Sequence, residues 1–314
     1  MRILVIKLGA LGDFVQAMGP AAAIRAHHRD DDITVLTTAP YVALAEAAPY
    51  FDRVWIDRRP HAFDLVGWWR LRRHLRHGTF DRVYDLQTSG RSSFYHWLMG
   101  RPQWSGSARG ASHPHRNPQR DLMHTLERQA EQLRLAGIDA VPPPQVSWAA
   151  LDVAHFGLSP RLLLLVPGGS AHRPLKRWPA ENYAALAALA ARHGLTPVVL
   201  GGAAERHLAA VICQRAPEAR DLTGRTSYGE IVGLARIAWR AVGNDTGPMH
   251  LIVAAGCAAT VLYSAESDPA LTAPRGKDVR VLRRTRLADL PVSEVAATLG
   301  LGESAAAVAG GRAP

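Results

Sequence analysis

The sequence predicts an α/β protein with two doubly wound domains, each a parallel sheet covered by helices. Short apolar, β-branched runs alternate with longer segments of helical periodicity along most of the chain, and this alternation is typical of βαβ units. It occurs twice, on either side of the proline run 142–144. The length of 314 residues also suits two domains, at roughly 150 residues per domain.

The first half of the chain contains four expected strands and four expected helices. The strands are Ile3–Ile6, Ile33–Thr37, Arg53–Ile56 and Arg82–Leu86. The helices are Phe14–His27, Tyr41–Ala47, Asp64–His77 and Asp121–Ala136. Residues 106–120 are rich in Gly, Ser, Pro, His and Arg, and we expect an irregular loop there.

The second half repeats the pattern. The strands are Leu162–Val166, Pro197–Leu200, Ala241–Val242 and Ala259–Leu262, and the helices are Ala180–His193, Ala204–Arg215, Tyr228–Arg236 and Thr246–Ala255. Three consecutive prolines cannot continue a helix or a central strand, so we expect a linker within residues 140–160. The expected domains are residues 1–150 and 151–300, and residues 301–314 are expected to form a frayed tail.

The composition limits the function. The chain carries 37 Lys and Arg against 27 Asp and Glu, a net charge of +10. This charge is shared evenly by the two halves, so there is no basic tail or basic domain. The net charge indicates either an Arg-rich proteome or an anionic partner. No helix-turn-helix, zinc-finger or RNP signature supports a nucleic-acid partner. Cys213 and Cys257 show neither a disulfide framework nor metal-ligand spacing. No secretory signal or membrane span is evident, so we expect a cytoplasmic or peripheral protein.

Ligands of open parallel sheets bind at the carboxyl ends of the strands, so the loops after the strands are the candidate site. The first such loop places Gly9, Gly12 and Asp13 before a helix. Asp13 can be the N-cap of that helix or a carboxylate free to act as a general base. The glycine spacing matches neither G-x-G-x-x-G nor a Walker loop.

Two loops of the second half combine small residues with charge. After Leu162–Val166, Ser170 and the glycines before it precede three cations, Arg173, Lys176 and Arg177. This composition indicates either an anion site or a solvated basic loop. After Pro197–Leu200, two glycines precede Glu205. Glu205 can stabilise the start of a helix or accept hydrogen bonds from a ribose.

The loop 243–251 is the most informative. Asp245 or Thr246 can cap the helix that follows, and the backbone N–H groups of Thr246 and Gly247 suit a phosphate. His250 lies one turn further along the same helix. A helix cap explains one polar residue here but leaves the combination of Asp, Thr, Gly and His unexplained.

These loops together resemble glycosyltransferase family 9, the ADP-heptose:lipopolysaccharide heptosyltransferases. The segments that carry the resemblance are Gly12-Asp13, Lys176-x-Trp178-Pro179, Gly201-Gly202-x-x-Glu205 and Gly243–His250, with Asp85-Leu86-Gln87 and Arg91-Ser92 as a further match. The match spans about residues 1–300. It implies a GT-B architecture, in which two Rossmann-like domains face each other across a cleft. It also implies an inverting, metal-independent transfer from a nucleotide sugar, with the acceptor bound by residues 1–150 and the donor by residues 151–300.

The resemblance also implies roles for individual residues. Asp13 would deprotonate the acceptor hydroxyl, and Lys176 would neutralise the leaving diphosphate. Glu205 would hold the donor ribose, and Asp245 the donor sugar. The diphosphate side would be bound by Thr246, Gly247 and His250, and Ser170 would add a donor contact. No cofactor or metal is expected beyond the substrate, a nucleotide sugar expected to be ADP-heptose.

The acceptor side is indicated by a basic, aromatic segment. Its arginines are Arg58, Arg59, Arg70, Arg72, Arg73 and Arg76, beside Trp68 and Trp69. Such a segment can bind an anionic glycolipid and hold the protein peripherally on the inner face of the cytoplasmic membrane. Alternatively, it is a solvated helix whose tryptophans pack in the core. Two rival functions stay open: a GT-B transferase with another nucleotide sugar or acceptor, and a non-catalytic basic binding protein.

Overall fold

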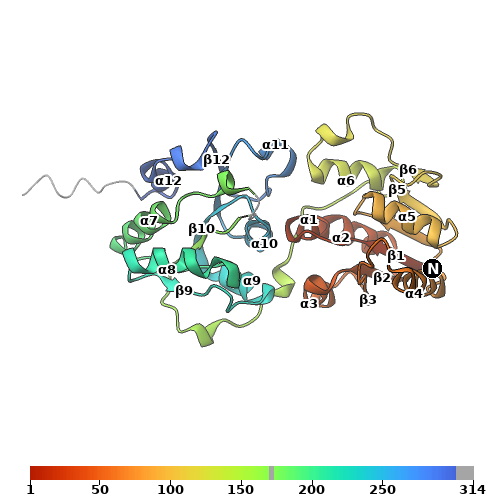
Figure 1. Ribbon diagram of the computed structural model, residues 1–314, viewed down its shortest axis with the longest axis horizontal. Coiled ribbons are helices and arrows are strands. Elements are labelled where there is room, and N and C mark those ends of the chain that lie inside the picture. Colours follow the sequence, from red (N-terminus) through yellow and green to blue (C-terminus); the bar gives the residue numbers. More distant parts are fainter. Residues whose placement is uncertain (170–172, 302–314) are drawn as a thin grey trace, which may run out of the picture. The chain divides into compact units, whose positions relative to one another are not determined.

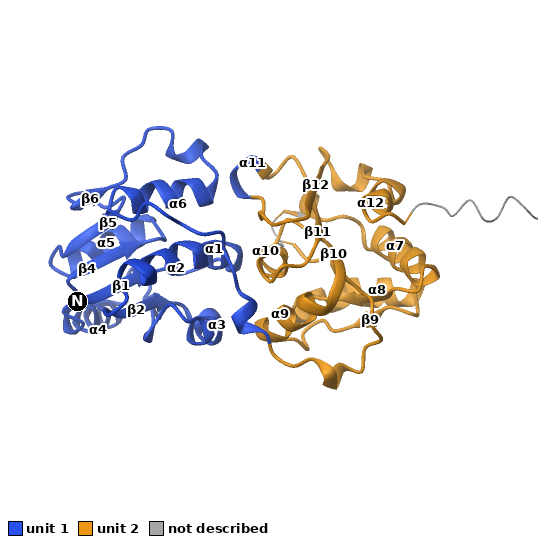
Figure 2. Ribbon diagram, turned by 180° about the vertical axis from the view of Figure 1, so that it is seen from behind, with its two compact units in different colours: residues 1–150, 270–272 blue, residues 151–269, 273–314 orange. Residues whose placement is uncertain are grey.

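The computed structural model describes residues 1–169 and 173–301 and divides the chain into two compact units (Figure 2). Unit 1 comprises residues 1–150 and 270–272, and unit 2 comprises residues 151–269 and those from 273 onward. The short segment 270–272 therefore departs from the domain limits expected from the sequence. Its backbone is held by unit 1, because the Thr272 carbonyl accepts a hydrogen bond from Gln16 Nε2 at 3.1 Å. The expected tail lies, from residue 302, outside the described residues.

Unit 1 is built on a six-stranded parallel sheet with strand order β3-β2-β1-β4-β5-β6 (Figure 1). The strands are β1 (Arg2–Ile6), β2 (Asp32–Thr37), β3 (Arg53–Ile56), β4 (Arg82–Asp85), β5 (Gln103–Gly106) and β6 (His113–Pro114). The helices are α1 (Leu11–Gln16), α2 (Met18–His27), α3 (Val42–Ala47), α4 (Leu65–His77), α5 (Gly90–Leu98) and α6 (Thr125–Arg134).

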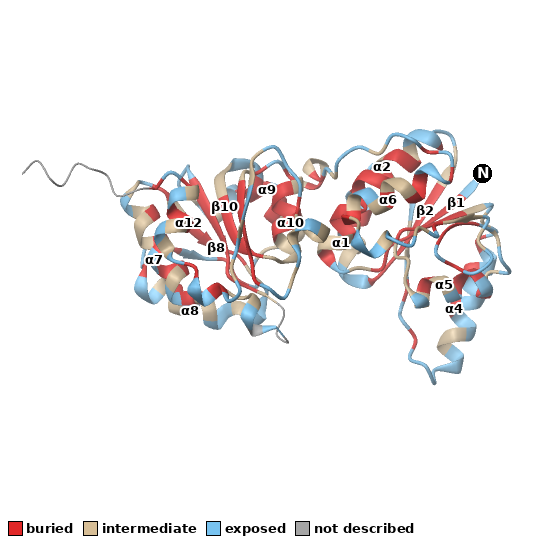
Figure 3. Cartoon of the chain, turned by 90° about the horizontal axis from the view of Figure 1, so that it is seen from above, coloured by how far each residue is buried: buried red, intermediate tan, exposed pale blue. Residues whose placement is uncertain are grey.

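Unit 2 repeats this topology, with strand order β12-β11-β10-β7-β8-β9 and all pairs parallel. Its strands are β7 (Leu162–Val166), β8 (Thr196–Val199), β9 (Arg220–Asp221), β10 (Ala238–Asn244), β11 (Ala259–Tyr263) and β12 (Val279–Arg283). Its helices are α7 (Ala180–Arg192), α8 (Arg206–Arg215), α9 (Tyr228–Ile237), α10 (Gly247–Ala254) and α12 (Val292–Thr298). In α11 (Pro269–Thr272), Pro269 belongs to unit 2 and the other three residues to unit 1. The central strand β7 is buried along its whole length, and its neighbours β8 and β10 are buried towards their carboxyl ends (Figure 3).

Each sheet reverses its strand order at one place, between β1 and β4 in unit 1 and between β7 and β10 in unit 2. This is the strand order of a Rossmann fold, whose ligands bind beyond the carboxyl ends of the strands at the reversal point. The α/β prediction and the two Rossmann-like units of a GT-B fold are confirmed. The fold thus marks one candidate binding position in each unit.

Several local expectations need correction. The single helix expected at Phe14–His27 is broken at Ala17 into α1 and α2. Pro20 has no N–H to donate to the carbonyl of Gln16, so the ladder of helical hydrogen bonds cannot continue through this point. The loop expected at 106–120 contains β6, and α5, β5, β9, β12 and α12 were not expected at all. Most of these are short or polar, which weakens their periodic signal.

Candidate active site

Asp13 lies beyond the end of β1, in the first turn of α1. The N-cap position of this helix is Ala10, whose carbonyl accepts a hydrogen bond from the Phe14 backbone N–H at 2.8 Å. Asp13 is therefore not the N-cap, and that alternative is wrong. Its partly exposed carboxylate lies in the first helical turn, where it interacts favourably with the helix dipole. The carboxylate also borders a pocket.

Asp13 borders a polar pocket of about 110 Å³ at the point where the strand order of unit 1 reverses. Three cations, Lys7, Arg120 and Arg128, line the same pocket. The remaining lining residues are Leu86, Gln87, Thr88, Gln129 and Gln132. Arg120 and Arg128 also pair with the exposed carboxylate of Asp121 at 3.6 and 3.9 Å. Long ion pairs at the surface are weak, so both guanidinium groups can still contact an anionic group of a substrate.

The floor of this pocket is held by buried groups. The Lys7 ammonium donates a hydrogen bond to the Leu86 carbonyl at 3.1 Å. Burial lowers the pKa of Lys7, although the carboxylates of Asp13 and Asp85 oppose this shift. Burial raises the pKa of Asp85 to about 6, against hydrogen bonds from the backbone N–H groups of Thr88 and Gln87. The segment that follows β4 is thereby fixed against the end of β1.

In unit 2, Lys176 and Asp245 form an ion pair between the loops that follow β7 and β10. Lys176 Nζ lies 2.8 Å from Asp245 Oδ2, and each side chain is 12% exposed. The Ser267 hydroxyl donates to the same carboxylate oxygen at 2.8 Å. Burial pushes the pKa of Asp245 upward, but the hydrogen bonds from Lys176 and Ser267 outweigh it and hold the pKa below its usual value. Two residues expected in the site therefore meet at the reversal point of the second sheet.

Asn244, the last residue of β10, organises the loops around this ion pair. Its buried amide donates to the carbonyls of Pro167 and Gly168 at 2.9 and 3.0 Å. Its oxygen accepts from the Trp178 backbone N–H at 3.0 Å and from the Tyr183 hydroxyl at 3.1 Å. One side chain thus fixes both ends of the segment that carries Lys176, and only an amide supplies donors and an acceptor at this place.

Glu205 helps to start the helical segment after β8. Its Oε2 accepts a hydrogen bond from the Gly202 backbone N–H at 2.8 Å, which is the helix-stabilising role. The side chain lies against Gly168, where an added Cβ would come within 3.1 Å of Glu205 Cγ. Glu205 therefore also lies beside the loop that follows β7, and the ribose contact stays a prediction.

The remaining donor residues lie around the start of α10. Thr246 occupies the N-cap position, and its hydroxyl donates to the Asn244 carbonyl at 3.2 Å instead of capping the helix. Gly247 is the first residue of α10, and His250 is buried one turn further on. Ser170 lies outside the described residues.

The six arginines expected on the acceptor side lie in unit 1, but not at the Asp13 pocket. Arg58 and Arg59 follow β3, and Arg70, Arg72, Arg73 and Arg76 lie on α4. None of the six lines the pocket at Asp13. They line neighbouring hollows at α4 instead, with the exception of Arg59. Within residues 1–169 and 173–301, no three His, Cys, Asp or Glu side chains gather as a metal site.

The two Rossmann-like units, each with charged loops at its reversal point, define a protein of GT-B type. The model of glycosyltransferase family 9 (heptosyltransferase) matches residues 68–294, and the chain belongs to this family. It is therefore a glycosyltransferase. Lipopolysaccharide heptosyltransferase 2 of Salmonella typhimurium is 27% identical over 307 residues, which cover 90% of this chain and 88% of that protein.

Two solved structures show the same fold. The ADP-heptose lps heptosyltransferase II of E. coli has a TM-score of 0.80 at 23% identity and covers 96% of this chain and 98% of its own. The E. coli heptosyltransferase WaaC, solved with ADP, has a TM-score of 0.75 at 20% identity and covers 96% and 99%. Both alignments span the two units.

Sequence reasoning missed part of the site. Lys7, Arg120 and Arg128 were not expected at Asp13, and no role was expected for Asn244, although it lies in the segment Gly243–His250. Lys7 had a usable signal, because it is one of only three lysines and directly follows a strand. Arg120 and Arg128 had none, since they come from a segment whose position depends on tertiary packing.

Proposed function

We propose that this enzyme transfers a heptose from ADP-heptose, with inversion and without a metal ion, to a lipopolysaccharide-core or related glycolipid acceptor. The observation that carries the proposal is the Lys176–Asp245 ion pair at the β7–β10 reversal point. It supplies a fixed cation where a Rossmann-like unit binds its ligand. The names of the relatives, heptosyltransferases described with ADP-heptose or ADP, support the choice of donor.

In the proposed reaction, the acceptor oxygen attacks the anomeric carbon of the donor and its proton passes to Asp13. The bond between that carbon and the diphosphate oxygen breaks, and the electron pair leaves with the nucleoside diphosphate. Negative charge grows on the leaving group, so a positioned cation stabilises the transition state more than the ground state. Lys176 is assigned this role, and Asp245, already hydrogen-bonded to it, is assigned to orient it and to contact the donor sugar.

The acceptor is assigned to unit 1. Lys7, Arg120 and Arg128 would bind an anionic group of the acceptor and hold its hydroxyl near Asp13. A lipid-linked acceptor implies an enzyme in the cytoplasm that associates peripherally with the inner face of the membrane. None of the described helices is long and apolar enough to cross a membrane.

A substitution series at Lys176 tests the metal-free chemistry. Lys176→Ala should lower turnover by about 10²–10³-fold and weaken donor binding much less, because the lost charge acts mainly in the transition state. Lys176→Arg should retain only part of the wild-type turnover, since a planar guanidinium does not replace a point charge. The exposed lysine variant Lys277→Ala is the matched control and should keep full turnover.

The assays are steady-state turnover with ADP-heptose, UDP-sugars and GDP-sugars, each with and without EDTA. We expect turnover with ADP-heptose that EDTA leaves intact. Activity that EDTA abolishes and Mg²⁺ or Mn²⁺ restores would contradict the metal-free mechanism. Turnover only with another nucleotide sugar would show that ADP-heptose is not the donor. The role of Lys176 would then be tested with the same variants and that nucleotide sugar.

A further inference from the structure

A cluster of large apolar side chains is exposed on unit 1, away from the residues that line the Asp13 pocket. Phe63 is 95% exposed, Leu65 78% and Trp69 56%, at the start of α4 and in the segment before it. Val66 on α4 and Phe94 and Trp97 on α5 are exposed as well. We call these six side chains the apolar tip. Exposed apolar residues gathered in this way mark an interaction surface.

The apolar tip spans the start of α4 and α5, and Trp68 lies between the two helices. The ring of Trp68 lies 5.4 Å from that of Phe94, which stacks on Trp97 at a centroid distance of 5.4 Å. Trp68 itself is half-buried, and its indole N–H donates to the His61 carbonyl at 2.9 Å. Trp68 therefore links α4 to the exposed rings of Phe94 and Trp97 on α5.

The tip is held in place by a buried polar network beneath it. The Tyr95 hydroxyl donates to Asp57 at 2.5 Å, and Arg91 donates to the Tyr95 oxygen at 2.6 Å and to the Pro60 carbonyl at 3.1 Å. The Arg91 guanidinium also lies 4.9 Å from the centre of the Trp68 ring. The segment between β3 and α4 is thereby fastened to α5, so the exposed side chains are presented on a fixed base.

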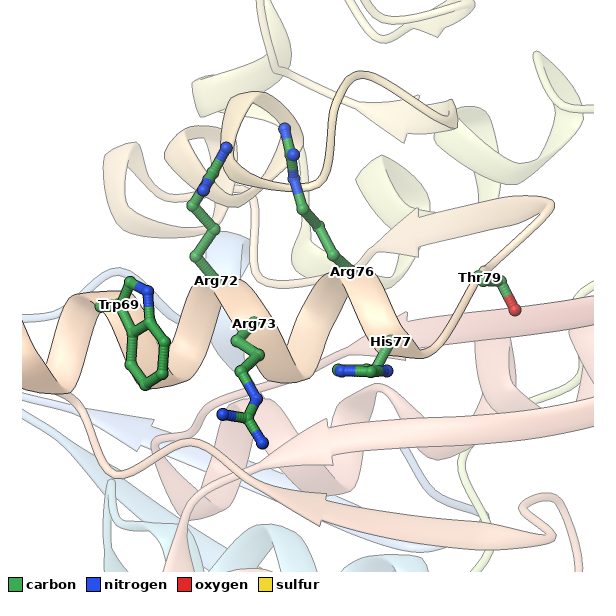
Figure 4. A pocket seen from close by; sticks show the side chains of 6 residues that line it. All are labelled: Trp69, Arg72, Arg73, Arg76, His77 and Thr79. Atoms are coloured by element: carbon green, nitrogen blue, oxygen red, sulfur yellow. The ribbon is translucent and has the colours of Figure 1, made fainter.

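The apolar tip continues directly into a basic surface. The second half of α4 carries Arg70, Arg72, Arg73 and Arg76, all exposed. Figure 4 shows Arg72 and Arg76 projecting from one side of the helix, and Trp69, Arg73 and His77 from the other. Arg73 lies over Trp69, with 5.3 Å between the guanidinium carbon and the ring centre. Neither α4 nor α5 contains an acidic residue.

We propose that this surface docks the enzyme on an anionic lipid bilayer, with the apolar tip inserted among the acyl chains and the α4 arginines at the phosphates. Tryptophan and phenylalanine beside arginines are typical of surfaces that lie in the membrane interface. Leu65 and Val66 favour hydrocarbon, because aliphatic side chains cannot stack on the bases of a nucleic acid as aromatic rings do. The inference extends the proposed lipid-linked acceptor, but its test involves no catalysis.

The test is co-sedimentation of the full chain with vesicles of equal parts phosphatidylglycerol and phosphatidylcholine, without donor or acceptor. We expect binding that weakens with added salt and on vesicles of phosphatidylcholine alone. The double variant Phe63→Ser, Trp69→Ser should bind at least about tenfold more weakly, because both side chains lose their insertion into the bilayer. The matched control Leu151→Ser, Ile237→Ser removes two exposed apolar side chains of unit 2 and should bind as the wild type does.

A second pair of variants tests the contribution of the positive charge on α4. Arg72→Gln, Arg73→Gln should weaken binding to the anionic vesicles, whereas Arg192→Gln, Arg215→Gln, with the same loss of charge on α7 and α8, should not. Thermal unfolding of every variant confirms folding. The proposal is overturned if the wild type does not bind the vesicles, or if the tip variants and their controls behave alike. It is also overturned if the tip instead drives a dimer in sedimentation or binds single-stranded DNA.

Discussion

The carboxylate of Asp13 can stabilise helix α1 or act as the general base of the reaction. The two roles predict different effects on stability and on turnover. In the first turn of α1 it interacts with the helix dipole, which contributes about 0.3–1 kcal/mol. As the general base it would contribute far more to turnover. Asp13→Asn should therefore lower kcat by roughly 10²–10⁴-fold, leave donor affinity almost unchanged and shift the melting temperature little.

Turnover, donor titration calorimetry and thermal unfolding measure these three effects for Asp13→Asn. Asp30→Asn removes another exposed carboxylate of unit 1 and is the control. If Asp13→Asn kept near-normal turnover, the carboxylate would be left with its helix role alone.

The buried carboxyl of Asp85 predicts a dependence of stability on pH. Because its folded-state pKa of about 6 is above the usual value, the folded protein holds this proton more tightly than the unfolded chain. The resulting stabilisation is complete below about pH 4 and is lost as the pH rises through 6, and amounts to about 3 kcal/mol. Asp85→Asn cannot titrate, so its stability relative to the wild type should rise by up to that amount from pH 4 to pH 7.

Urea unfolding of the two proteins across this pH range measures the difference at Asp85. The other carboxyl groups are common to both proteins and cancel in the comparison. A difference that stayed constant with pH would mean that Asp85 titrates as an ordinary carboxyl group.

At the scale of elements, the strands flanking the two reversal points were predictable because they are apolar and bounded by glycine or charge. Helix α5 was missed because its first turn, Gly90 to Ser93, is polar and gives no apolar period. Its start depends on the capping pair Ser89 and Ser92, a local signal that could have been found. The break at Ala17 was also readable from Pro20. The position of α6 over β4 and β5, where Gln132 donates to the carbonyls of Asp85 and Ser105, depends on tertiary packing.

One glycine shows how closely the linker packs on a helix. A Cβ at Gly19 in α2 would lie 2.2 Å from the backbone oxygen of Pro142. A Cβ at Gly90 in α5 would have no atom within 4 Å beyond its chain neighbours and the backbone of its own helix. Gly19→Ala should lower the free energy of unfolding by about 1–3 kcal/mol through this overlap. Gly90→Ala should leave it unchanged or raise it by up to about 1 kcal/mol.

Chemical denaturation of both variants provides the comparison for this close approach. If both substitutions changed the free energy of unfolding equally, the backbone at Pro142 would be able to move away from the added methyl group without loss of stability.

For the whole molecule, the sequence predicted the loops that carry chemistry but only part of what those loops hold. Lys176 and Asp245 were both expected on the donor side, yet their ion pair depends on β7 and β10 being neighbours. Strand order is set by the crossover connections and not by local periodicity. In the same way, Arg120 and Arg128 reach Asp13 only through the packing of unit 1.

The repeated topology makes a prediction about where the nucleotide binds. Unit 2 gathers Lys176, Asp245, Glu205 and the first turn of α10 around the ends of β7, β8 and β10. A diphosphate there would accept hydrogen bonds from backbone N–H groups at the start of α10. Hydrogen exchange of the full chain with saturating ADP should therefore slow in residues 173–178, 201–205 and 243–250, with little change in residues 1–140.

Parallel experiments with UDP and GDP separate recognition of the base from binding of the diphosphate. If ADP protects these segments and the other two nucleotides do so only at higher concentration, unit 2 distinguishes the base as well as binding the phosphates. Protection by ADP confined to residues 1–140 would place the nucleotide in unit 1. The Lys176–Asp245 pair would then be a structural ion pair, and the leaving diphosphate would have to be stabilised by Lys7, Arg120 and Arg128 instead.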